Sequence, residues 1–332
     1  MCRVSRCHGA RRGRGDAIDK SLKTLLVLLG VLAFCGLRAE AQIVDRITFR
    51  TPEEAASALA GACREHNESQ LLSILGPLGG EIISSGDVIA DKAALQKFAD
   101  AFEQAHELVP APDGALVLQV GPESWPLPIP IVKHGDTWYF ATFAGKAELI
   151  SRRIKSNELS AINVCRLYVE LQTEYGQRNR DPNNQAPLYA QKLRSDPGAH
   201  NGLYWDDKAG GARSPAGALF ALAAQEGYRP DGSQQVPYHG YYFRILTAQG
   251  ESAPGGKQSY FCENDIGVLA VRKMTKGFAL VAYPAKYGST GTKTFIVNQD
   301  GIVYEQDFGS RTEDVARRMT EYNPDQSWSQ VY

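Results

Sequence analysis

The sequence predicts an α+β protein with two domains behind an export leader. Apolar residues recur at helical spacing in several segments, and within 91–107 Leu95, Phe98 and Phe102 share one helical face. Later segments alternate apolar and polar residues, which is typical of strands, and an Asp300-Gly301 turn predicts a hairpin between two of them. Helices and strands that come in separate runs favour an α+β fold.

Residues 1–41 have the layout of a secretory signal peptide. A basic leader precedes an apolar run at 25–37, which is closed by Ala39-Glu40-Ala41. The run is shorter than the roughly 20 residues that span a bilayer. We therefore expect an exported chain, periplasmic or extracellular, with no stable membrane span after cleavage. An uncleaved leader that anchors the chain in the membrane is the alternative.

The charge balance of the mature chain argues against nucleic-acid binding. The leader holds eight of the 36 Lys and Arg residues but three of the 37 Asp and Glu residues, so the mature chain is mildly acidic. A protein that grips nucleic acid usually carries a basic surplus. The sequence also lacks a phosphate-binding loop, a dinucleotide fingerprint and a metal-binding motif. We expect no cofactor and no metal, and we assign no catalytic residue.

Three cysteines follow the leader, namely Cys63, Cys165 and Cys262. Their spacing matches no zinc pattern. Cys63 and Cys165 fall in predicted amphipathic helices, which favours small buried hydrophobic residues. A disulfide between two of the three is the alternative.

The first domain is predicted over 42–150. Thr51, Pro52 and Glu54 mark a helix start, and a second helix ends at Gly76-Pro77. Further elements are expected in this order: a strand at 81–85, a helix at 91–107, and strands at 115–120, 129–133 and 137–143. Over 43–145 this order resembles the cone-shaped domains related to nuclear transport factor 2 and the SnoaL cyclases, in which a curved sheet wraps a long helix.

The second domain is predicted over 151–332. A helical region at 146–177 is expected to break near Ser156-Asn157. Short helices are expected at 188–193 and 215–225, and strands at 241–248, 278–283, 293–297 and 302–306. A long helix followed by an antiparallel meander resembles the globular head of type IV pilins, without their amino-terminal assembly helix.

Four longer motifs resemble a bacterial secreted family known as domain of unknown function 2950. The motifs are Trp125-Pro126-Leu127-Pro128-Ile129-Pro130, Asn157-Glu158-Leu159-Ser160-Ala161-Ile162, the segment 238–250 that begins Tyr238-His239-Gly240-Tyr241, and the segment 277–284. The resemblance covers nearly all of the mature chain and departs from the family pattern between Gln258 and Lys276. It implies export and assigns no activity.

Several side chains are candidates for chemistry, each with a structural alternative. His239 could act as a general base, but the sequence shows no partner for it, so we expect a structural histidine bonded to a loop carbonyl. Asn179, Asp181, Asn183 and Asn184 resemble the start of a calcium loop, but the glycine and glutamate of that loop are absent. We expect an Asx-rich turn there.

Three further features have structural interpretations. Prolines at 126, 128 and 130 remove donors along one strand edge, which predicts a protected edge strand or a polyproline segment. Ser289 lies between glycines without the order of a nucleophile elbow, which predicts a tight turn. Trp125, Trp138 and Tyr139 could line a pocket in the first domain.

These observations favour a cell-envelope protein that acts by non-catalytic binding or scaffolding, with an envelope protein or a small ligand as partner. A hydrolase or isomerase with its pocket in the first domain is the alternative, and a small-ligand carrier would use the same cavity. A filled first domain favours scaffolding, whereas a deep cavity with inward-facing ionisable groups favours catalysis.

We predict that the mature protein begins at Gln42, because Ala39 and Ala41 supply the small residues that a signal peptidase needs. Amino-terminal sequencing of envelope fractions checks this. A mature product that keeps residues 1–41 would show that the leader is not cleaved.

Overall fold

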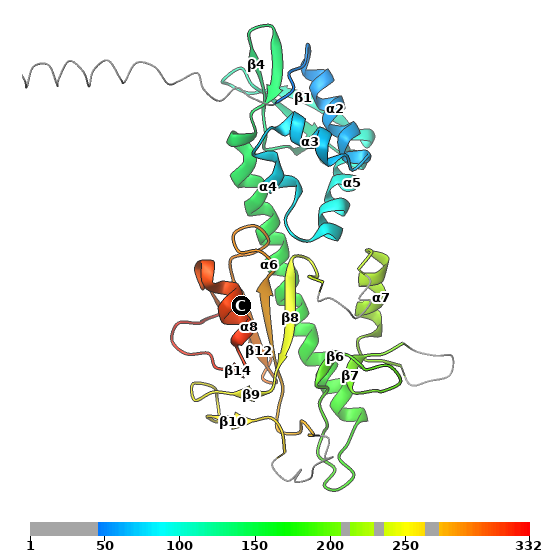
Figure 1. The fold of residues 1–332 in the computed structure, drawn as a ribbon, viewed down its shortest axis with the longest axis vertical. Coiled ribbons are helices and arrows are strands. Elements are labelled where there is room, and N and C mark those ends of the chain that lie inside the picture. The colour runs from blue at the N-terminus through cyan, green and yellow to red at the C-terminus, as the bar shows by residue number, and fades with distance from the viewer. Residues whose placement is uncertain (1–45, 207–212, 229–235, 263–271) are drawn as a thin grey trace, which may run out of the picture. The chain divides into compact units, whose positions relative to one another are not determined.

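The computed structural model describes residues 46–206, 213–228, 236–262 and 272–332, which belong to one unit (Figure 1). The predicted signal peptide lies outside the described residues. Helices and several antiparallel sheets make up the unit, so the prediction of an α+β fold is confirmed.

The first helices follow local sequence signals. Helix α2 (Pro52–Arg64) begins after Thr51, whose hydroxyl accepts a hydrogen bond of 3.1 Å from the Glu54 backbone N–H. Asp87 caps the last of these helices in the same way through the Ala90 N–H. The other helices of this layer are α3 (Glu68–Leu75), α4 (Gly79–Ile83) and α5 (Val88–Gln104).

The strand predicted at 81–85 is wrong, because residues 81–83 form the end of α4 and Ser84 is its C-cap. The isoleucine pair suggested a strand, but a short helical turn buries Ile83 and leaves Ile82 half-buried. The carbonyls of Glu81 and Ile82 then accept hydrogen bonds from the guanidinium of Arg153. A cationic side chain at a helix carboxyl end stabilises the unpaired carbonyls there.

The first sheet is antiparallel with the strand order β1-β2-β4-β5, and β3 pairs with β2 beside this path. Its strands are β1 (His106–Pro110), β2 (Leu116–Val120), β3 (Trp125–Pro126), β4 (Ile131–His134) and β5 (Thr137–Phe140). The helix predicted to reach residue 107 ends at Gln104, and β1 follows it. Of the three alternating prolines, Pro126 lies in the short strand β3, while Pro128 and Pro130 lie in the connection to β4.

Helix α6 (Thr142–Arg178) is continuous over 37 residues, so the break predicted near Ser156-Asn157 is wrong. The polar side chains there bond to a distant turn instead of ending the helix. Asn157 donates to the Thr290 carbonyl at 3.0 Å, and Glu158 accepts from the Thr292 backbone N–H at 2.9 Å. Figure 1 shows α6 running from the first helices to the second sheet.

The second sheet has the order β15-β13-β12-β11-β8. Its strands are β8 (Tyr241–Leu246), β11 (Ala279–Pro284), β12 (Thr294–Asn298), β13 (Tyr304–Gln306) and β15 (Ser329–Gln330). The hairpin predicted at 298–301 joins β12 and β13 and is confirmed. The strand predicted at 241–248 is divided between β8 and β9.

Smaller elements surround this sheet. They are β6 (Lys192–Arg194) paired with β7 (Gly202–Tyr204), the strands β9 (Ala248–Gln249), β10 (Gln258–Ser259) and β14 (Glu321–Tyr322), and the helices α7 (Gly217–Gln225), η1 (Gly309–Arg311) and α8 (Thr312–Arg318). The helix predicted at 215–225 is confirmed as α7. The helix predicted at 188–193 is wrong, because Ala190 is buried against Gln172 and the chain enters β6 at Lys192.

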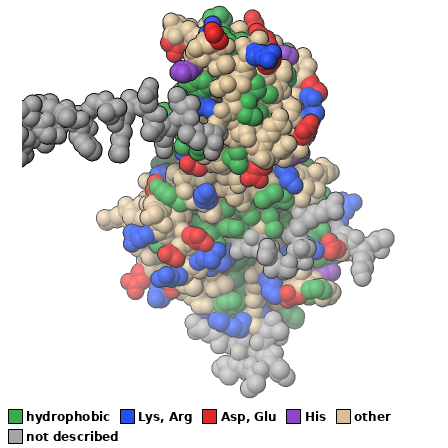
Figure 2. Space-filling model, turned by 45° about the horizontal axis from the view of Figure 1, so that its top comes forward, with side chains coloured by type: hydrophobic (Ala, Val, Ile, Leu, Met, Phe, Trp, Pro, Cys, Tyr) green, Lys and Arg blue, Asp and Glu red, His purple; other side chains and the backbone are tan. Residues whose placement is uncertain are grey.

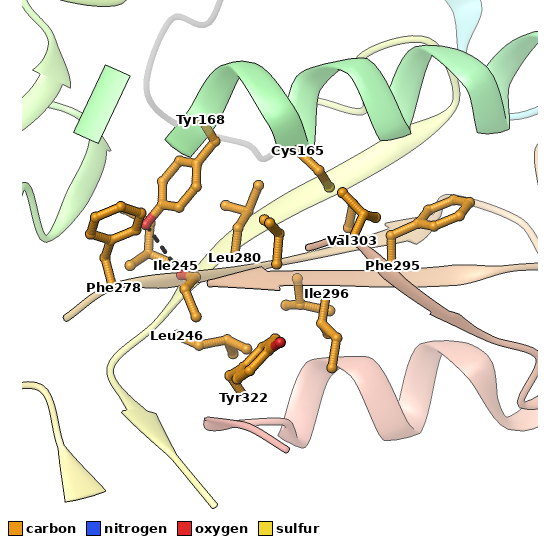
Figure 3. Packing of buried hydrophobic residues seen from close by; sticks show 14 of the residues in the cluster. Cys165, Tyr168, Ile245, Leu246, Phe278, Leu280, Phe295, Ile296, Val303 and Tyr322 are labelled. Atoms are coloured by element: carbon orange, nitrogen blue, oxygen red, sulfur yellow. Dashed lines mark hydrogen bonds between the residues drawn. The ribbon is translucent and has the colours of Figure 1, made fainter. Parts of the chain in front are cut away.

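Two groups of buried apolar residues pack on α6 and its neighbours. One spans Ala55 to Phe140 and includes Leu149 at its margin, and the other begins at Ala161. In the second group Cys165 and Tyr168 point from α6 onto the strands, and the Tyr168 hydroxyl donates to the Ala279 carbonyl at 3.2 Å (Figure 3). The division into domains at residues 150 and 151 stays a prediction.

Helix α6 lies directly on the proline segment at Gly145. A Cβ atom added to Gly145 would lie 2.3 Å from the Pro128 carbonyl oxygen and 2.5 Å from the Ile129 nitrogen. Both neighbours are backbone atoms of a segment that prolines stiffen, so neither can easily move. Glycine is therefore required at this position by the close approach of two backbones.

We predict that Gly145→Ala lowers the free energy of unfolding, although alanine is the better helix former by about 1 kcal/mol. The matched control is Gly61→Ala in α2, where an added Cβ meets nothing within 4 Å, and which should stabilise by up to about 1 kcal/mol. Urea unfolding of both variants measures whether each substitution lowers or raises the free energy of unfolding. A stabilised Gly145→Ala variant would contradict the close contact.

Candidate functional site: an apolar cavity beside a polar junction

A cavity of about 500 Å³ lies among the first helices, the proline segment and α6. Its walls are mostly apolar. They include Leu59, Leu71, Leu95, Phe98, Leu127 and Leu149. Volumes of about 300–1,000 Å³ with apolar walls and a few polar groups are typical of small-molecule sites.

Helix α5 exposes its apolar stripe to this cavity. The helix buries only Ala99 and Phe102 fully, while Leu95 and Phe98 are half-buried and line the cavity. The sequence therefore identified the amphipathic face of this helix correctly. It did not show that part of this face lines a cavity. Figure 2 shows hydrophobic side chains at the surface between charged ones on the face that it displays.

Asp91 and Arg153 are ionisable groups in the cavity wall. The Asp91 carboxyl accepts a hydrogen bond of 2.8 Å from the Ser85 backbone N–H, and burial raises its pKa above the ordinary value. Burial lowers the pKa of Arg153, and the nearby Asp91 offsets only part of this effect. Both charged forms are thus less well solvated than they would be in water.

A buried polar junction lies next to the cavity, centred on Asp87. Asp87 is 1% exposed, and its carboxyl group accepts hydrogen bonds from the Tyr228 hydroxyl at 2.9 Å and the Gly240 N–H at 2.8 Å. The same carboxyl group also caps α5. Gly240 has a positive φ of 74°, and a Cβ there would lie 2.5 Å from the Asn157 side chain. Three of the motifs that carried the family resemblance therefore have residues at this junction or in the adjoining cavity wall.

His239 lines the cavity at this junction, and its side chain is about one-third exposed. Its Nε2 lies 2.9 Å from a carboxyl oxygen of Glu226, so the expected bond to a loop carbonyl is wrong. Sequence reasoning missed this partner because Glu226 lies 13 residues away, just beyond α7. Burial, followed by the charge of Glu226, raises the pKa of Tyr238 to about 12.

The other candidate residues have structural partners. Asp181 accepts from the Asn183 N–H at 3.1 Å and pairs with Lys273, and Asn184 accepts from the Ala186 N–H, so an Asx-rich turn is confirmed. Among the described residues, no group of His, Cys, Asp and Glu side chains could hold a metal ion. Ser289 lies in a tight turn closed by the Gly288 N–H and the Gly291 carbonyl.

Of the three aromatic residues proposed to line a pocket, Trp125 lines the cavity, with the Arg152 guanidinium 5.2 Å from its ring centre. Trp138 and Tyr139 do not line it. The Lys133 ammonium lies 5.9 Å from the ring centre of Trp138, and the Arg46 guanidinium lies 4.1 Å from that of Tyr139.

The three cysteines that follow the leader are free thiols in the structure. Cys63 lies in the cavity wall, and Cys165 lies in the second group of buried apolar residues, which begins at Ala161. Burial raises the pKa of each of these two thiols to about 12, so both stay protonated at neutral pH. This is the behaviour of small buried hydrophobic residues.

The described residues define an α+β protein with an apolar cavity beside a polar junction, and none of its described helices is long and apolar enough to cross a membrane. The family model described as "Protein of unknown function (DUF2950)" matches residues 46–331. The chain belongs to this family, as its motifs indicated. No curated protein and no solved structure matched the chain.

Proposed function

We propose that this protein is exported to the cell envelope and acts there by binding a small apolar ligand, without catalysis. Export is supported by the leader sequence, and binding by the cavity. The observation that carries the proposal is the apolar stripe of α5, whose Leu95 and Phe98 face the cavity.

The energetics of this stripe favour a ligand. Apolar surface that leaves water contributes roughly 25 cal/mol per Å². Leu95 and Phe98 are half-buried. Folding therefore removes only part of their apolar surface from water, and they contribute only part of the corresponding free energy. A ligand in the cavity would cover them, as well as Leu127 and Leu149 on the opposite walls. An open cavity of this size also favours ligand binding over a purely scaffolding role.

Two of the ionisable groups of the wall, Asp91 and Arg153, support binding more than catalysis. Asp91 is bonded to the backbone of Ser85, and Arg153 is bonded to two carbonyls at the end of α4. Both groups therefore serve the fold. A general base needs a nucleophile or a substrate atom within hydrogen-bond reach, whereas these hydrogen bonds join both groups to backbone atoms.

A finer description of the fold belongs to the same proposal. We place the cavity at the side of a cone-like domain, which α2–α5 and the sheet β1-β2-β4-β5 form, where helix α6 adds Leu149 and Arg153 to the wall. Helix α6 packs against the strands β11 and β12, and this packing supports a pilin-head-like second domain. In this arrangement the cone holds the ligand and the second sheet supports the junction beside it.

We predict that the neutral apolar dye Nile red binds saturably, and that Ala94→Trp weakens its binding at least about tenfold, because an indole at the rim displaces ligand from Leu95 and Phe98. Ala94 lines the cavity and is exposed, so the variant should fold. Lys92→Trp on the same helix is the control, because Lys92 is exposed and does not line the cavity. Fluorescence titration measures both. Equal affinity in the two variants would contradict binding in the cavity.

The second candidate function is a hydrolase or isomerase, and the His239–Glu226 pair favours it. A carboxyl group that orients an imidazole is one part of a general-base site. Our proposal predicts no turnover of short-chain nitrophenyl esters above the background rate. Turnover that His239→Gln abolishes and Lys155→Gln leaves intact would establish the enzyme instead.

A further inference from the structure

The charged groups in the cavity wall have an excess of cations. Lys97 and Arg153 line the cavity together with a single carboxyl group, Asp91. Lys97 is exposed and Arg153 is half-buried. The apolar walls around them reduce the screening by water, so this imbalance acts more strongly on a bound ligand than it would at an open surface.

Arg153 has unused hydrogen-bonding capacity. A guanidinium carries five N–H donors, and two bonds are formed, to the carbonyls of Glu81 and Ile82. In the part of the chain that the structure describes, no carboxylate lies within ion-pair distance of Arg153, in contrast to Arg152, which pairs with Glu148 at 2.7 Å. The remaining donors can therefore serve an anion.

Asp91 does not neutralise this site. Its carboxyl group is turned to the Ser85 N–H, and burial disfavours its charged form. The effect of burial on Arg153 exceeds the effect of Asp91, so the guanidinium charge is incompletely compensated. An anion brought in by a ligand would supply the missing compensation and would form charge-assisted hydrogen bonds.

We propose that the ligand is an amphiphile with a single apolar chain and an anionic head, whose chain lies along Leu95 and Phe98 and whose head binds Arg153, with Lys97 as a second cation. This inference rests on the proposed binding function and adds the class of ligand. The head and the chain of such a ligand would share one site, because the apolar walls and the two cations line the same cavity.

The test compares three probes with the same chain and different heads, namely dodecanoate, dodecanol and dodecylammonium, in competition with Nile red at neutral pH. Dodecanoate should displace the dye at a concentration at least about tenfold lower than either other probe, since its carboxylate can pair with the charge of Arg153 through charge-assisted hydrogen bonds and the other two heads cannot. Equal displacement by all three probes would overturn the anionic head but leave the apolar site intact. Absence of displacement by every probe, with no saturable dye binding, would overturn the proposed function itself.

Variants locate the head group. Arg153→Gln should abolish the preference for dodecanoate over dodecanol, while Arg153→Lys, which keeps the charge, should retain most of it. Lys155→Gln is the matched control, because Lys155 is exposed on the same helix and does not line the cavity. Circular dichroism checks folding, and if Arg153→Gln fails to fold, the Arg153→Lys variant and the wild-type comparison decide. An undiminished preference in a folded Arg153→Gln variant would overturn the role of Arg153.

Discussion

The buried carboxyl group of Asp87 is the constraint on which the arrangement around the cavity depends. It accepts hydrogen bonds from the Ala90 N–H, the Tyr228 hydroxyl and the Gly240 N–H, at 2.8–3.0 Å. These donors come from three separate segments of the chain. A buried donor without an acceptor costs about 1–3 kcal/mol, so each bond holds its segment against the others. The start of α5 and the start of β8 are thereby fixed at one point.

The cavity follows from how α5 is held. Its first turn is tied to the junction by Asp87, and its last turns are packed into the core by Ala99 and Phe102. The middle of the helix therefore cannot pack more deeply, and Leu95 and Phe98 face a cavity that the side chains of the described residues leave open. Arg153, tied to the end of α4, brings a cation to the same space. The contacts that fix both ends of α5 thus stabilise the fold and also leave room for a ligand beside the middle of the helix.

Local signals in the sequence were enough for much of the fold. The Thr51 cap, the Gly76-Pro77 helix end and the hairpin at 298–301 depend on neighbouring residues, and the structure contains all three. The continuity of α6 was missed because Asn157 and Glu158 bond to residues more than 130 positions away. The junction was missed for the same reason, since no pattern near Asp87 in the sequence predicts its hydrogen bonds to Tyr228 and Gly240. The cavity itself depends on how the elements pack, which residue spacing alone does not specify.

We propose that the space beside α5 is a ligand site. A crystal structure of the protein with an alkanoate that carries bromine at the end of its chain, with anomalous scattering used to locate the bromine, tests this proposal. We expect an anomalous peak among Leu59, Leu71 and Phe98, with the carboxylate oriented toward Arg153. An empty cavity in fully soaked crystals, or bromine bound only on the outer surface, would contradict it.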